Sequence, residues 1–170
     1  MEALEAIFTR RSIRQYTSRN VPEALVKVLL EAGMSAPSTS NLQPWHFVVI
    51  KDHRLLCEIP KFHPYSEMLK KAPLAILVCG DLSVQKQEGY VVQDCSAATQ
   101  NILLAAHAKK LGAVWLGIYP KEARVAGIRK LFGLPGHILP VSLIAIGFPA
   151  EQKPRENRYK PARVHFNSWK

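Results

Sequence analysis

The six residues Leu74-Ala75-Ile76-Leu77-Val78-Cys79 decide how this chain folds, because they form an unbroken apolar run of strand length. A strand with one face in water alternates apolar and polar residues, whereas a strand covered on both faces reads as a continuous apolar run. A second apolar stretch, residues 141–146, lies towards the end of the sequence. Both stretches are far too short to cross a bilayer, so they predict buried strands of a soluble protein.

Further strands and several helices are predicted around these two runs. The strands are expected at residues 47–50, 74–79, 113–118 and 139–148. The helices are expected at the N-terminus and at residues 20–33, 53–59, 65–71, 90–111 and 121–132. Helices that alternate with only about four strands are typical of an α+β, three-layer α/β/α domain. No Gly-x-Gly-x-x-Gly turn is present, which disfavours a Rossmann dinucleotide fold.

Three of these helices carry signals for an end or a buried face. Asn20 and Glu23 have the spacing of a capping box, so Asn20 is the predicted N-cap. The buried face of the same helix is predicted from Leu25, Val28, Leu29 and Ala32. An apolar stripe on the opening helix consists of Leu4, Ile7 and Phe8. On the long helix 90–111, Asp94 and His107 are expected to be capping or hydrogen-bonded core groups rather than catalysts.

Composition restricts the classes of function. The 170 residues suit one domain, and Lys and Arg number 23 against 13 acidic residues, which gives a formal charge of +10. An excess of positive charge favours anionic partners, but the sequence has no helix-turn-helix, RNA-binding or zinc-finger signature. Phosphorylated small molecules fit this charge as well, and we expect neither a nucleic acid nor a membrane as a partner.

The cysteines and histidines show no spacing that indicates a metal site or a disulfide framework. Cys57, Cys79 and Cys95 are odd in number and lack a Cys-x-x-Cys pair. No His-Glu-x-x-His or similar pair of ligands is present, so no metal is expected. Free thiols indicate the reducing cytoplasm. The N-terminus contains Glu2 and Glu5 and no long apolar core, so it is not expected to be a secretory signal.

A basic segment, Thr-Arg-Arg-Ser-Ile-Arg-Gln-Tyr at residues 9–16, follows the opening helix. Guanidinium groups stay charged and present planar sets of N–H donors, which suit the oxygens of a phosphate. Arg10, Arg11 and Arg14, with the Ser12 hydroxyl, are therefore candidates for an anion site. Taken alone, a solvated basic surface explains the segment better, since short basic runs are common.

A second segment, Ala-Pro-Ser-Thr-Ser-Asn-Leu-Gln-Pro-Trp at residues 36–45, changes that interpretation. An Arg-Arg-Ser-x-Arg-x-Tyr segment followed by Ala-Pro-Ser-x-x-Asn-x-Gln-Pro-Trp resembles the FMN-dependent nitroreductase family. The resemblance continues through Lys-Ala-Pro at 71–73, Asp-Cys-Ser-Ala-Ala-Thr-Gln-Asn at 94–101, Trp-Leu-Gly at 115–117 and Gly-Phe-Pro at 147–149. It covers essentially the whole chain, in the family's order and spacing.

The resemblance implies a mixed, mainly antiparallel sheet flanked by helices, an intertwined homodimer and tightly but noncovalently bound FMN. The residues implied at the phosphate and ribityl end are Arg10, Arg11, Ser12, Arg14 and Arg158. Those implied to line the flavin ring from the partner chain are Pro37, Ser38, Thr39 and Asn41. Leu116 and Gly117 are implied to place backbone amides beside the reactive nitrogen of the flavin, where a small residue permits close approach.

The implied reaction is a ping-pong transfer of hydride from NADH or NADPH to a nitroaromatic, a quinone or a similar small acceptor. No protein acid or base is named as catalytic, because the cofactor supplies the reactivity. A flavin reductase, a reductive dehalogenase and a flavin-binding protein without turnover are the alternatives. Residues 153–170 form a basic tail of the same domain, 1–170, and Phe166 and Trp169 predict that it docks on the dimer. Lys160 and Arg155 are alternatives to Arg158 as its phosphate ligand.

Overall fold

Four strands form the central sheet of the computed structural model, which describes residues 1–169. The order across the sheet is β1-β2-β4-β3, and all three neighbouring pairs are antiparallel. The strands are β1 (Trp45–Ile50), β2 (Leu74–Asp81), β3 (Gly112–Gly117) and β4 (Ile138–Gly147). An isolated parallel bridge joins Ser12 to Ala113 at the outer edge of β3.

The two central strands, β2 and β4, are buried along their whole length. Side chains of β2 alternate between two apolar clusters, because successive residues of a strand point to opposite faces. Leu74, Ile76 and Val78 belong to the first cluster, and Ala75, Leu77 and Cys79 belong to the second. A shift of register between Val78 and Cys79, which pair with Ser142 and Pro140, interrupts the pairing of the two strands. The continuous apolar run is thus a strand covered on both faces, as predicted.

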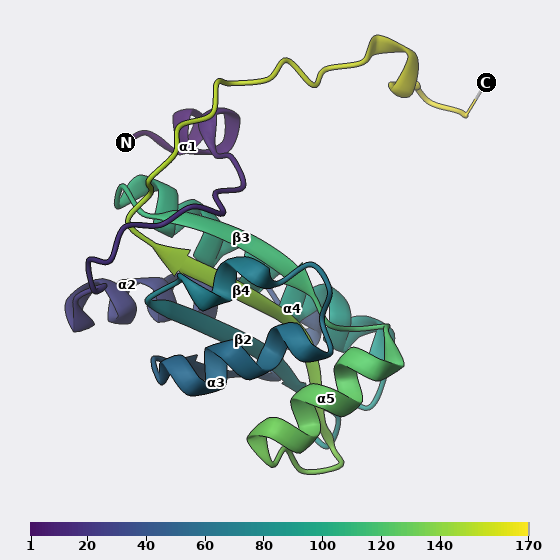
Figure 1. Cartoon of the computed structure of the whole chain (residues 1–170). Helices are drawn as coiled ribbons and strands as arrows, with labels where there is room; N and C mark the ends of the chain where they lie inside the picture. The colour runs from purple at the N-terminus through teal and green to yellow at the C-terminus, as the bar shows by residue number, and fades with distance from the viewer. Residues whose placement is uncertain (170) are drawn as a thin grey trace.

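Helices cover both faces of the sheet and complete three layers (Figure 1). One layer contains α2 (Glu23–Met34) and α4 (Glu88–Ala108), which pack against each other and contribute to the first cluster. The other contains α3 (His53–Glu58), the 3-10 turns η2 (Ile59–Lys61) and η3 (Glu67–Lys70), and α5 (Glu122–Phe132). The predicted three-layer α+β fold is therefore confirmed. No helix within residues 1–169 is long and apolar enough to cross a membrane.

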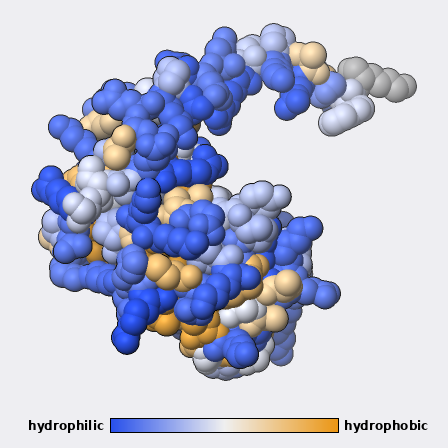
Figure 2. Space-filling model, viewed as in Figure 1, coloured by the Kyte–Doolittle hydropathy of each residue, from blue (hydrophilic) through white to orange (hydrophobic). Residues whose placement is uncertain are grey.

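The opening helix and the residues that directly follow β4 both lie on the β3 side of the sheet (Figure 1). The short helix α1 (Ala3–Thr9) precedes the basic segment, and the residues after β4 run past it before the tail extends away from the body (Figure 1). The tail contains one 3-10 turn, η4 (Pro161–Arg163), and its surface is mainly hydrophilic (Figure 2). Within the described residues the rings of Phe166 and Trp169 are 82% and 84% exposed, so the tail does not bury them against its own chain.

Three local predictions were wrong. The buried face of α2 was predicted from Leu25, Val28, Leu29 and Ala32, but the buried residues of this helix are Val26, Leu29 and Gly33. The N-cap of α2 is Pro22, with no side-chain cap, because the helix begins three residues after Asn20. The stripe of α1 that was predicted from Leu4, Ile7 and Phe8 is exposed, and Ala6 is the buried residue of this helix. A seven-residue helix at the edge of the domain has little sheet surface to cover, so its amphipathic pattern does not identify a buried face in this chain.

Gly80 in β2 allows α4 to lie directly against the sheet. A Cβ atom at this position would overlap with Val91 Cγ1 and would lie 3.0 Å from Cys95 Sγ. We expect Gly80→Ala to lower the free energy of unfolding by about 2 kcal/mol, because an added group in a packed core displaces its neighbours. Urea unfolding followed by tryptophan fluorescence measures this change. Gly136→Ala is the matched control, since a Cβ there meets no atom within 4 Å, and equal midpoints for both variants would contradict the close packing of α4.

Candidate functional site

The basic segment leaves α1 and runs along the edge of the sheet. Ile13 donates its backbone N–H to the Ala113 carbonyl at 3.0 Å, beside the bridge between Ser12 and Ala113. Tyr16 ends the segment with its ring buried and its hydroxyl 2.7 Å from the Ile13 carbonyl and 3.2 Å from that of Ala145. Burial raises the pKa of Tyr16, so its hydroxyl remains a donor. The segment is thus anchored to the sheet by its backbone and by one buried ring.

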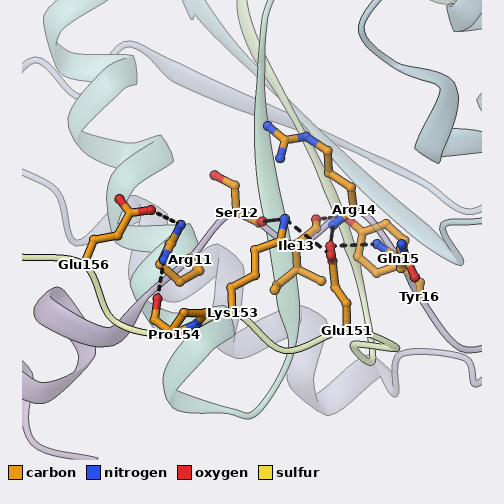
Figure 3. Close-up of polar contacts among 10 residues, drawn as sticks. All are labelled: Arg11, Ser12, Ile13, Arg14, Gln15, Tyr16, Glu151, Lys153, Pro154 and Glu156. Carbon is orange, nitrogen blue, oxygen red and sulfur yellow. Dashed lines mark hydrogen bonds and ion pairs between the residues drawn. The ribbon is translucent and has the colours of Figure 1, made fainter.

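Residues that follow β4 hold the same segment from the other side (Figure 3). Glu151 Oε1 accepts the backbone N–H groups of Arg14 at 2.6 Å and Gln15 at 3.2 Å. Lys153 Nζ donates to the Ser12 carbonyl at 2.9 Å and lies 3.4 Å from Glu151 Oε2. The backbone of the segment is therefore fixed, while its arginine side chains extend from it.

Because of the carboxylate of Glu151, we expect the folded protein to lose stability at acid pH. The hydrogen bond from Arg14 N–H, with further help from Lys153, lowers the pKa of Glu151 below its ordinary value. A group whose folded-state pKa is lowered stabilises the fold above its unfolded pKa, and this contribution is lost as the pH falls through the folded pKa. We expect Glu151→Gln to lower the Tm at pH 7, and the difference from wild type to shrink below about pH 4. Thermal melts from pH 3 to pH 8, with Glu2→Gln as the exposed control, measure this, and a difference that is independent of pH would contradict the expectation.

A basic pocket of about 390 Å³ lies between α1, the first arginines and the tail. Arg11 binds the Glu156 carboxylate and the Pro154 carbonyl, and Arg158 Nη2 lies 2.9 Å from Glu156 Oε2. Arg10 lines the same pocket, and its buried Nε has no hydrogen-bond partner in residues 1–169. Burial, followed by the charges of Arg158 and Arg11, lowers the pKa of Arg10. Four arginines line the pocket, Arg10, Arg11, Arg155 and Arg158, and only Arg11 and Arg158 contact its one carboxylate, Glu156, so the pocket retains an excess of positive charge.

A second pocket of about 500 Å³ lies beyond Ser12, at the end of β3. Arg14 extends into this region, away from Arg11 (Figure 3). The lining residues include Arg14, His63, Tyr65, Leu116, Gly117 and Arg124. A Cβ atom on Gly117 would meet no atom within 4 Å, so a ligand can approach the backbone there. The structure therefore separates Arg14 from Arg10, Arg11 and Arg158, and brings it together with Leu116 and Gly117.

The loop between α2 and β1 has a strained backbone that is fixed by a buried carboxylate. Ser40, Asn41 and Gln43 have positive φ angles of 53°, 54° and 49°, a region that is costly for residues other than glycine. Asp94 Oδ1, on α4, accepts the backbone N–H of Thr39 at 3.0 Å and its hydroxyl at 3.2 Å. Asp94 is only 4% exposed, so this carboxylate is a core group, as predicted from the sequence.

The remaining residues predicted for the flavin ring also lie in this loop. Pro37 and Asn41 are exposed, and Ser38 is half-buried, with its hydroxyl accepting the Gln43 N–H at 3.0 Å. Within the described part of the chain, no hydrogen bond or ion pair joins this loop to the basic segment. One chain therefore does not bring the two sets of predicted residues together.

Sequence reasoning missed four side chains that bind the backbone beside these pockets. Lys153 and Glu151 bind the backbone of the basic segment, and His63 and Arg124 bind the Gly117 carbonyl. Lys153 belongs to the basic tail, but the residues predicted from that tail were Arg158, Lys160 and Arg155, and spacing alone does not show which residue returns to the sheet. His63 and Arg124 lie 54 and 7 residues from Gly117 and belong to no common motif, so no local pattern identifies them.

Comparison with known proteins relates this chain to one family. The model of the nitroreductase family matches residues 7–63 and 53–148 of this chain. A protein of Methanothermobacter thermautotrophicus, named "Putative NADH dehydrogenase/NAD(P)H nitroreductase", is 52% identical over 169 residues, which cover 99% of this chain and 88% of that protein.

Solved structures with similar folds include proteins that are described with FMN. The FMN-dependent nitroreductase from Clostridium difficile superposes with a TM-score of 0.90 at 28% identity, covering 98% of this chain and 99% of that chain. The structure titled "putative nitroreductase in complex with fmn", from Desulfovibrio desulfuricans, superposes with a TM-score of 0.85 at 35% identity. That match covers 99% of this chain and 97% of the other.

Proposed function

Since this chain belongs to the nitroreductase family, we propose that it binds FMN and transfers hydride from NADH or NADPH to a small acceptor such as a nitroaromatic or a quinone. Its relatives include proteins named NAD(P)H nitroreductase, NADPH-flavin oxidoreductase and FMN reductase. We expect a ping-pong sequence, in which the oxidised nicotinamide leaves before the acceptor enters the same pocket.

The observation that carries this proposal is the pair of pockets on either side of Ser12. Arg11 lines the basic pocket and Arg14 lines the pocket at Gly117. These residues are three apart, so their Cα atoms lie at most about 11 Å from each other. A molecule with a phosphate at one end and a flat ring at the other, joined by a flexible chain, fits such an arrangement. The excess positive charge beside Arg10 suits the phosphate end, and the open space at Gly117 suits the flat ring.

Each group of residues has a separate task in this proposal. Arg10, Arg11 and Arg158 bind the phosphate. To do so, Arg11 and Arg158 release the carboxylate of Glu156 and bind the phosphate oxygens in its place. The Ser12 hydroxyl adds a donor, and Lys153 keeps the backbone of Ser12 in place. Leu116 and Gly117 present backbone amides to the ring, and Arg14 offers a positive charge in the same pocket. When bound, FMN supplies the chemistry of accepting and donating a hydride, so the side chains need only position and stabilise it.

We also propose that the active form is an intertwined homodimer. The loop with Pro37, Ser38, Thr39 and Asn41 is held by Asp94 at Thr39 and exposes Pro37 and Asn41, which suits a surface that completes the partner's pocket. The tail, residues 153–170 of the same domain, carries exposed aromatic rings that gain free energy when a second chain covers them. Cys57, Cys79 and Cys95 are free thiols, in agreement with a cytoplasmic location.

An absorbance spectrum of the purified protein, followed by anaerobic addition of NADH and then NADPH, tests the proposal. We expect a yellow protein whose flavin absorbance is lost on reduction and returns with a nitroaromatic or a quinone. A yellow protein that neither reductant bleaches would support flavin binding without turnover. A protein that stays colourless after FMN has been added would contradict the proposed function.

A further inference from the structure

The carbonyl oxygen of Gly117 accepts hydrogen bonds from two side chains on different elements. Arg124 Nη1 donates to it at 2.8 Å, and His63 Nε2 lies 3.0 Å from it. Gly117 is the last residue of β3, and the two residues after it both donate backbone N–H groups to the single carbonyl of Val141. The chain therefore leaves the regular pairing of β3 with β4 at this point. Beyond it, the side chains of Arg124 and His63 hold the Gly117 carbonyl in place of strand pairing.

His63 is a rigid and neutral donor. Its side chain is 1% exposed, its backbone N–H binds the Ile59 carbonyl at 3.0 Å, and its own carbonyl accepts the Ser66 hydroxyl at 2.7 Å. Burial, followed by the charge of Arg124, lowers the pKa of His63, so the imidazole is neutral at physiological pH. A neutral imidazole has one N–H, and the carbonyl that faces Nε2 assigns the proton to that nitrogen.

Arg124 adds a permanent charge to the same oxygen. It lies in the first turn of α5, where its backbone N–H binds the Lys121 carbonyl at 2.9 Å. Its guanidinium carbon lies 5.5 Å from the centroid of the Tyr65 ring. In the part of the chain that the structure describes, no carboxylate forms an ion pair with Arg124 or with Arg14. Glu67 also lines the pocket, but its carboxylate pairs with Lys70 at 2.7 Å, so neither guanidinium group forms an ion pair with it.

We propose that Arg124 and His63 are positioning residues, which hold the Leu116–Gly117 backbone against the flavin ring and favour its electron-rich reduced form through the charge of Arg124. The inference rests on the proposed function, because that function places the ring in this pocket. Glycine has the widest range of backbone angles, so the peptide groups beside Gly117 need external contacts to keep one orientation. Hydrogen bonds from charged donors are about twice as strong as those from neutral donors. Arg124 therefore contributes more than His63 to holding the Leu116–Gly117 backbone.

Four variants distinguish the effect of each hydrogen-bond donor from the effect of the charge of Arg124. Arg124→Gln removes the charge, Arg124→Lys keeps it, His63→Leu removes a donor, and His63→Gln retains an N–H donor. We expect Arg124→Gln to weaken FMN binding about tenfold and to lower the midpoint potential of the bound flavin. Arg124→Lys should lower the potential less, His63→Leu should weaken FMN binding, and His63→Gln should resemble the wild type. The measurements are flavin fluorescence titration of the apoprotein, dye-coupled potentiometry and the Tm of each apoprotein.

Arg129→Gln is the matched control. Arg129 lies on the same helix and also donates to backbone carbonyls, those of Pro135 and Gly136, outside the pocket at Gly117. Its removal should leave the potential and the FMN affinity unchanged. An Arg124→Gln protein with the wild-type potential would overturn the inference, even if its Tm fell, because the residue would then be only structural. A wild-type protein that fails to bind FMN would instead contradict the proposed function.

Discussion

Gly117→Val is expected to weaken FMN binding by about 100-fold while the apoprotein keeps the Tm of the wild type. The residue lines the pocket at the end of β3, and a Cβ there meets no atom within 4 Å, so the fold has room for a side chain. In the proposed complex the flavin ring uses that room. Overlap with a ligand that is held at its phosphate end costs about 1–3 kcal/mol, comparable to overpacking in a core, and the upper part of this range corresponds to about 100-fold in affinity.

Two measurements on the same preparation decide this prediction. Titration of the apoprotein with FMN gives the affinity, and thermal unfolding without FMN gives the stability. Gly136→Val is the control, because its Cβ also meets no atom within 4 Å and it lies outside both pockets. A Gly117→Val protein that binds FMN as tightly as the wild type would show that the ring does not approach this backbone.

Asp94→Leu is expected to lower the free energy of unfolding by about 3 kcal/mol and to weaken FMN binding at least about tenfold. The substitution removes the acceptor of both Thr39 donors, and each buried donor without a partner costs about 1–3 kcal/mol. The positive φ angles of Ser40, Asn41 and Gln43 then lose the contact that holds the loop in place. In the proposed dimer this loop lines the partner's flavin, so affinity falls together with stability.

Asp94→Asn is the matched variant, because it retains an oxygen that can accept both bonds from Thr39. We expect its unfolding free energy to stay close to that of the wild type. Urea unfolding and FMN titration of both variants measure the two effects. An Asp94→Leu protein with wild-type stability and affinity would show that the strained loop holds its shape without the carboxylate.

The fold followed from the sequence where the pattern of apolar residues was decisive. The run 74–79 is the core of β2, and α5 ends at Phe132, as predicted, with Gly133 as its C-cap in the left-handed conformation. Predictions failed at the edges of the domain, at Asn20 and on α1, where few packing contacts select one local structure. A capping box needs only three residues of spacing, so it also occurs where the helix begins later.

The candidate site was only partly predictable. Local motifs identified Arg10, Arg11, Ser12 and Arg14 as one group, since they adjoin in sequence. The structure divides this group because successive residues of an extended segment point to different sides, which places Arg11 and Arg14 in separate pockets. The contacts of Lys153, His63 and Arg124 depend on how distant elements meet, and that information is not local.

The basic segment is held mainly through its main chain. The Ser12 carbonyl and the N–H groups of Ile13, Arg14 and Gln15 make the contacts with the sheet, Lys153 and Glu151. Within residues 1–169, the side chains of Arg10, Ser12 and Arg14 form no hydrogen bond, and that of Arg11 binds only Glu156 and Pro154 of the tail. Substitution at these positions changes what the protein binds at little cost to folding. A scaffold of this kind lets ligand preference diverge between relatives while the architecture is inherited unchanged.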